Sequence, residues 1–87
     1  MSRAHGTPAN TAYTLTLTRD GQTIATLQNV SYSTAQQAYP AMLADHVATS
    51  TYDDALVRRD AREYWEDLDS TDNVTYRGVT AVLQAAN

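Results

Sequence analysis

Residues 13 to 18, Tyr-Thr-Leu-Thr-Leu-Thr, alternate strictly between apolar and polar side chains. Such alternation places the tyrosine and both leucines on one side of a β-strand and the threonines on the other. The chain turns at Asp20-Gly21 and continues with β-favouring residues from Thr23, which predicts a β-hairpin. Because the strand has one apolar face, the rest of the chain must supply a layer that covers it.

The register of this hairpin depends on the length of its loop. A two-residue loop sets Leu17 opposite Ile24, whereas a three-residue loop with a bulge sets Leu15 opposite Ala25. We favour the second register because it keeps Leu27 on the apolar face of the hairpin.

Two helical patterns follow the hairpin. Residues 33 to 36, Ser-Thr-Ala-Gln, have the form of a capping box, and apolar residues then recur at intervals of three and four up to Val47. Pro40 falls on the expected polar side of this pattern, so we expect a kinked helix there. Ser50 or Thr51 caps a second helix with four residues in its expected buried stripe. That stripe consists of Val57, Ala61, Tyr64 and Leu68.

The end of the chain is predicted to return to the sheet. Residues 70 to 73 are typical of a loop, and residues 74 to 83 form a strand interrupted by a bulge at Gly78. The predicted order is ββααβ, an α+β fold with two antiparallel helices on one face of a three-stranded antiparallel sheet. The last strand is expected beside the first. One domain spans residues 12–87, after a flexible tail at residues 1–11.

The composition limits the classes of function. The 87 residues include ten acids, six arginines, no lysine and no cysteine, for a formal net charge of −4. This charge argues against direct binding to nucleic acid or anionic membranes, because both need a cationic surface. No apolar run approaches the roughly 20 residues of a membrane span, and the N-terminus lacks the apolar stretch of a secretory signal. We therefore expect a cytoplasmic protein, and the arginine and alanine usage suggests an actinobacterium or one of its phages.

Enzymatic chemistry has little support in the sequence. There is no glycine-rich phosphate loop, no G-x-S-x-G motif and no cysteine nucleophile. His46 has only Asp45, Asp53 and Asp54 as acids that could join it in a metal site, and a metal needs three or four converging ligands. We therefore expect a non-catalytic protein with no metal and no cofactor.

Residues 52 to 72 have the most unusual composition. They contain eight of the ten acids, three of the six arginines and the only tryptophan, and eight acids with three arginines give a net charge of −5. At about 100° per residue, four acids line one flank of the second helix and two arginines adjoin the tryptophan on the other. The candidate partner-binding residues are an acidic ridge, Asp53, Asp60, Glu63 and Asp67, and a Trp/Arg patch, Arg58, Arg62 and Trp65.

This segment favours a small protein-binding module that docks through its acidic second helix on a partner with a basic surface, anchored by Trp65. A narrower hypothesis is a nucleic-acid mimic, carried by a phage or mobile element, that inhibits a nucleic-acid-binding enzyme of the host. The non-functional interpretation is a solvated helix face with ion pairs four residues apart.

Two alternative functions remain open. One is a nucleic-acid-binding domain that presents Tyr13, Tyr32 and Tyr76, with Arg19 and Arg77, on an open sheet face. The other is a structural homo-oligomer whose copies pair through an exposed sheet edge, so a homodimer is a further expectation.

Overall fold

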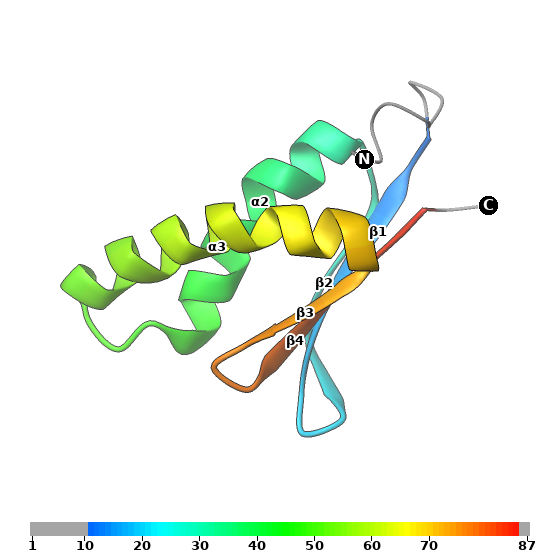
Figure 1. Cartoon of the computed structure of the whole chain (residues 1–87). Helices are drawn as coiled ribbons and strands as arrows, with labels where there is room; N and C mark the ends of the chain where they lie inside the picture. Colours follow the sequence, from blue (N-terminus) through cyan, green and yellow to red (C-terminus); the bar gives the residue numbers. More distant parts are fainter. Residues whose placement is uncertain (1–10, 86–87) are drawn as a thin grey trace.

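Two helices lie on one face of a four-stranded antiparallel sheet in the computed structural model, which describes residues 11–85 (Figure 1). The elements are β1 (Tyr13–Arg19), β2 (Gln22–Val30), α2 (Tyr32–Val47), α3 (Thr51–Thr71), β3 (Asn73–Tyr76) and β4 (Val79–Ala85). The strand order is β2-β1-β4-β3, so the last strand lies beside the first, as predicted. The predicted tail falls, apart from Thr11, outside the described residues. Neither described helix is long and apolar enough to cross a membrane.

The predicted three-stranded sheet is wrong, because the predicted final strand is a hairpin of two strands. Arg77 and Gly78 have φ angles of 51° and 81°, and they form the turn that pairs Tyr76 with Val79. Two positive φ angles in a two-residue turn match the right-handed twist of the flanking strands. Arg-Gly is not the usual Asn-Gly or Asp-Gly signal, so in the sequence the change of alternation at Gly78 resembles a bulge.

The first hairpin combines features of both predicted registers. Its loop has two residues, both with positive φ angles. Ile24 is an extra residue in β2, and this irregularity places Ala25 opposite Leu17. Both predicted registers are therefore wrong in their pairs, although Leu27 still packs against the core. A bulge that shifts the register by one residue keeps the apolar side chains on the covered face.

Both helices have a serine N-cap, but the cap of α2, the environment of Pro40 and the end of α3 differ from the prediction. The hydroxyl of Ser31, not that of Ser33, caps α2 by accepting the N–H of Thr34 at 3.1 Å. Pro40 lies within α2 and is buried, not on a polar face. Ser50 caps α3 and is one of the two caps predicted for this helix. Residues 70 to 73 are not a loop, because α3 continues to Thr71 and the single residue Asp72 links it to β3.

The core lies between the sheet and the two helices. Alternate residues of β1 and β4 are buried, and threonines occupy most of the intervening positions on the open face of the sheet. Three residues of the predicted stripe on α3 are buried, but Trp65 completes it in place of the half-buried Tyr64. The Trp65 indole N–H donates to the hydroxyl of Tyr32 at 3.0 Å, which joins the two helices.

Candidate functional site

Asp53, the first acid of the ridge, is engaged by Arg77 from the turn between β3 and β4. Both terminal nitrogens of Arg77 donate to the carboxylate, at 2.7 and 2.9 Å, and the backbone N–H of Thr49 donates at 2.9 Å. The hydrogen bonds from Arg77, and then that from Thr49, hold the pKa of Asp53 well below its ordinary value. The charge of Asp53 therefore serves the fold by joining the second hairpin to the start of α3.

Asp60, the second acid of the ridge, is also engaged within the fold. Its carboxylate accepts the hydroxyl of Tyr76 at 2.8 Å and lies 3.4 Å from a guanidinium nitrogen of Arg59. Burial, and then this hydrogen bond, raise the pKa of Tyr76. The Tyr76 ring packs edge-on against Tyr64, with ring centroids 5.2 Å apart. Asp60 thus connects α3 to β3 beside a pair of packed aromatic rings.

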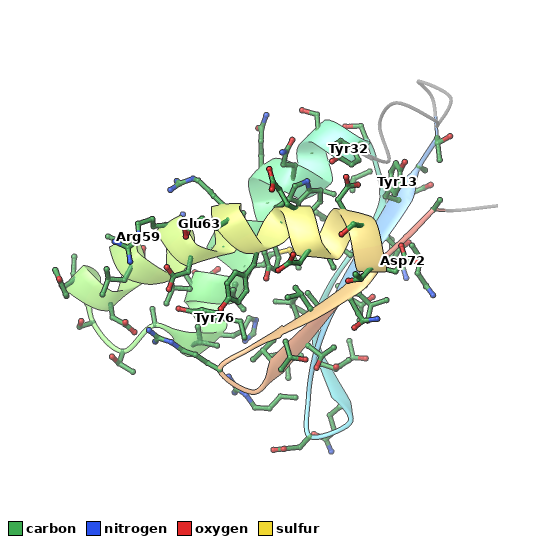
Figure 2. All side chains as sticks on the ribbon, viewed as in Figure 1. Tyr13, Tyr32, Arg59, Glu63, Asp72 and Tyr76 are labelled. Carbon is green, nitrogen blue, oxygen red and sulfur yellow. The ribbon has the colours of Figure 1, made fainter. Side chains whose placement is uncertain are left out.

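Glu63 and Asp67 complete the ridge and differ from the other two acids. Both side chains are exposed, and Glu63 lies on the outer side of α3 (Figure 2). Within residues 11–85, no hydrogen bond or ion pair engages either carboxylate. Arg59 lies four residues before Glu63, but its guanidinium approaches Asp60 instead. The structure therefore divides the ridge into two acids that serve the fold and two that face solvent.

Charge of a single sign continues to the end of α3. Residues 63 to 72 include five acids and no basic residue. These five, which we call the acidic end, are Glu63, Glu66, Asp67, Asp69 and Asp72. The C-terminus of a helix carries partial negative charge, so carboxylates near it are electrostatically unfavourable.

The Trp/Arg patch lies on the flank of α3 that faces α2. Arg58 is ion-paired with Asp54 at 2.6 Å, whereas the exposed Arg62 has no ion pair within the described part of the chain. Trp65 is only 4% exposed. Burial of its indole leaves it little surface to offer to a partner in the free protein.

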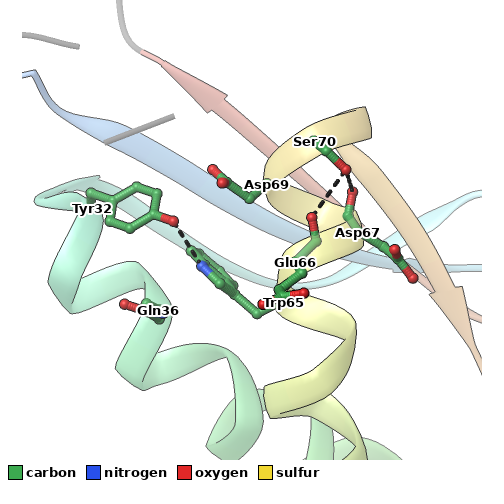
Figure 3. A pocket seen from close by; sticks show the side chains of 7 residues that line it. All are labelled: Tyr32, Gln36, Trp65, Glu66, Asp67, Asp69 and Ser70. Carbon is green, nitrogen blue, oxygen red and sulfur yellow. Dashed lines mark hydrogen bonds between the residues drawn. The ribbon is translucent and has the colours of Figure 1, made fainter. Parts of the chain in front are cut away.

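Two hollows lie on either side of Trp65, between α2 and α3. Trp65 and Gln36 line both of them. The first hollow, drawn in Figure 3, is lined further by Tyr32, Glu66, Asp67, Asp69 and Ser70. The second is lined further by Gln37, Pro40, Arg58 and Arg62. The surface beside Trp65 thus changes from basic to acidic along α3.

The exposed aromatic residue of α3 is Tyr52, which is 76% exposed. Tyr52, the half-exposed Leu56, Arg59 and Glu63 recur at intervals of four and three residues, so they share the outer side of the helix. Tyr52 is the first residue of the segment 52 to 72 but was not among the predicted partner-binding residues, which were chosen for their charge or their proximity to Trp65. Tyr52 lies outside the predicted apolar stripe, and this position could have indicated that its side chain is exposed.

The residues named for nucleic-acid binding do not gather on the open sheet face. Tyr13 and Tyr76 are 1% and 8% exposed and belong to the core beneath the helices, and Arg77 is engaged by Asp53. Thr14, Thr16 and other uncharged side chains occupy the open face of β1. Among the described residues, no three His, Cys, Asp or Glu side chains come together as a potential metal site.

Comparison with protein-family models, with curated proteins and with solved structures finds no match to this chain. The candidate site is therefore defined by its geometry. It consists of an outer surface on α3, which has Tyr52 and Leu56 at one end and the acidic end at the other, and of the hollows beside Trp65.

Proposed function

We propose that this chain is a small non-catalytic protein-binding module that docks through the outer surface and acidic end of α3 on a partner with a basic surface. The observation that carries the proposal is charge of one sign at the unfavourable end of a helix. An acid in the last turn, such as Asp69, lowers stability by about 0.3–1 kcal/mol at low ionic strength through the helix dipole, and like charges four residues apart, such as Glu63 and Asp67, add about 0.2–0.5 kcal/mol per pair. A helix that served only the fold would gain from arginine at these positions, so the acids are better explained by a partner.

The arrangement supports both fast association and a specific contact. The exposed carboxylates of Glu63, Glu66 and Asp67 steer a basic partner toward the surface, an effect that weakens as salt is added. Tyrosine is among the residue types enriched where binding energy concentrates, so Tyr52 with Leu56 takes the anchoring role proposed from the sequence for Trp65. The partner would then contact an apolar patch and a carboxylate patch along one helix.

Inhibition of a nucleic-acid-binding protein is the narrower form of this proposal. A mimic needs carboxylates spaced like strand phosphates, roughly 6–7 Å apart. On the ridge, only Glu63 and Asp67, about 6 Å apart along the helix axis, are both solvent-facing and suitably spaced. Asp53 and Asp60 are engaged by Arg77 and Tyr76. A basic protein surface of any kind is therefore favoured over strict mimicry.

The test compares partner capture by two folded double variants of equal charge. Glu63→Gln/Asp67→Asn alters the acidic end, whereas Asp20→Asn/Asp45→Asn neutralises two exposed acids away from α3. Both change the formal net charge from −4 to −2. Affinity capture with quantitative mass spectrometry should show one protein with a basic surface retained by the natural chain and the control, and lost from the first variant.

Three outcomes would contradict the proposal. Loss from both variants would assign binding to net charge alone. If both variants kept the partner and Tyr52→Ala also kept it, the contact would lie outside the outer surface and acidic end of α3. Absence of any stoichiometric partner for the natural chain would remove the protein-binding function itself.

A further inference from the structure

The flank of α3 that faces α2 carries charges of both signs in a fixed order. Two arginines come first, the tryptophan lies in the middle, and two carboxylates follow. In chain order they are Arg58, Arg62, Trp65, Glu66 and Asp69. These residues line the two hollows beside Trp65, which share Gln36 of α2. We call this surface the α2–α3 groove, which is basic at one end and acidic at the other.

The central charges of the groove are not used within the fold. Arg62 and Glu66 are one helical turn apart, a spacing that suits an ion pair, yet no ion pair joins them in the described structure. A basic residue that precedes an acid by four positions is the weaker orientation for such a pair. Arg58, by contrast, is paired with Asp54. Arg62 and Glu66 are exposed and can therefore both meet charges from outside the chain.

We propose that the α2–α3 groove binds a second copy of this chain, with the two α3 helices antiparallel about a twofold axis near Trp65. A twofold interface brings the same surface of both copies together, so that surface must be complementary to itself. Arginines followed by carboxylates meet this condition, because reversing one helix sets the basic end of each copy against the acidic end of the other. Arg62 then faces the Glu66–Asp69 end of the second copy, twice.

The order of charges favours a second copy over an unrelated protein. An unrelated partner would impose no relation between the two ends of the groove, whereas two copies related by a twofold axis attract each other only if the two ends carry opposite charges. Two helices per copy form a small and largely polar contact, so the dimer is expected to be reversible and dependent on concentration. Glu66, Asp67 and Asp69 of the acidic end line the first hollow, so the dimer would cover part of the proposed docking surface and leave Tyr52, Leu56 and Glu63 exposed.

Sedimentation velocity over micromolar to millimolar concentrations tests this proposal with charge-reversed variants. The natural chain should change from monomer to dimer as its concentration rises. Arg62→Glu alone, or Glu66→Arg alone, should raise the dimer dissociation constant about tenfold or more, because like charges then meet across the axis. The double variant Arg62→Glu/Glu66→Arg has the natural net charge and restores opposite signs at positions 62 and 66, while Arg58 and Asp69 keep their signs. It should therefore dimerise again.

A control separates this interface from general effects of charge. Arg19→Glu makes the same charge change at the end of β1, outside the groove, and should leave the dissociation constant nearly unchanged. Circular dichroism checks that each variant is folded. A natural chain that stays monomeric at every concentration would overturn the proposal. So would a dimer that survives Arg62→Glu, which places the contact elsewhere, or a double variant that stays monomeric.

Discussion

The two halves of α3 use the same kinds of charged residues in different ways. In the first half, Asp53, Asp54 and Asp60 are engaged by Arg77, Arg58 and Tyr76, and the first two also lie at the favourable end of the helix dipole. In the second half, Glu63, Glu66 and Asp67 are exposed, without described partners, at the unfavourable end. Composition alone treats these halves as one acidic segment, but the fold engages Asp53, Asp54 and Asp60 and leaves Glu63, Glu66 and Asp67 exposed.

The largest expected effect on stability is at the contact between α3 and the core. It is tested by comparing two aromatic residues of this helix. Trp65→Ala should lower the free energy of unfolding by about 3–5 kcal/mol, because it empties a buried site and removes the hydrogen bond to Tyr32. Tyr52→Ala should change it by less than about 0.5 kcal/mol, because Tyr52 is exposed. Urea denaturation measures both. Equal losses would contradict the assignment of Trp65 to the core and Tyr52 to the surface.

The next effect concerns the dependence of stability on pH in the first half of α3. The folded-state pKa of Asp53 is lowered by Arg77, so its contribution is present above the unfolded pKa of about 3.9 and is lost as the pH falls through the folded value. Asp53→Asn should therefore be less stable than the natural chain at pH 7 and should lose less stability on acidification. Denaturation at a series of pH values measures this.

The matched control for that series is Asp45→Asn, which neutralises an exposed acid of α2. Its stability should follow that of the natural chain across the series. If Asp53→Asn behaved in the same way, the ion pair with Arg77 would not contribute to the fold.

A smaller effect is expected from the hydrogen bond between α3 and β3. Tyr76→Phe removes only the hydroxyl that donates to Asp60, so the free energy of unfolding should fall by about 0.5–1.5 kcal/mol. Tyr64→Phe removes a hydroxyl from the ring that packs against Tyr76 and should have a smaller effect. A double-mutant cycle with Asp60→Ala measures the coupling. Coupling near zero would remove Asp60 from the acids that serve the fold.

The smallest expected effect is the change in stability that added salt causes through the acids in the second half of α3. Raising the ionic strength screens the exposed carboxylates from one another and from the helix dipole. The natural chain should therefore gain about 0.2–0.5 kcal/mol more from added salt than the variant Glu63→Gln/Glu66→Gln/Asp67→Asn, because Glu63 and Asp67 are like charges four residues apart. Thermal denaturation at low and high sodium chloride measures this difference. An equal response would show that these acids do not strain the helix.

Local patterns predicted the parts of the fold that depend on neighbouring residues. Alternation gave the correct faces of β1, and the cap at Ser50 with Asp53 and Asp54 in the first turn was confirmed. The fourth strand was missed because an Arg-Gly turn has no strong local signal. The correct hairpin register depends on a bulge at Ile24 that no spacing rule specifies.

Contacts between distant segments determine the rest of the site. Trp65 and Tyr64 both lie near the edge of the predicted stripe, and Tyr32, 33 residues from Trp65, makes the hydrogen bond that holds the indole in place. The division of the ridge depends likewise on Tyr76 and Arg77, which approach α3 only because β3 and β4 form a hairpin. Position on a helix can therefore predict a row of acids, but not which of them the fold already engages.

The most direct test of the contrast within α3 is the free energy of unfolding of two triple variants, measured side by side in urea at pH 7. Asp53→Asn/Asp54→Asn/Asp60→Asn neutralises the first half, and Glu63→Gln/Glu66→Gln/Asp67→Asn neutralises the second, with an equal change in net charge. We expect the first variant to be clearly less stable than the natural chain and the second to be as stable or more stable. A second variant destabilised as much as the first would mean that the acidic end also serves the fold, and the case for a partner would fail.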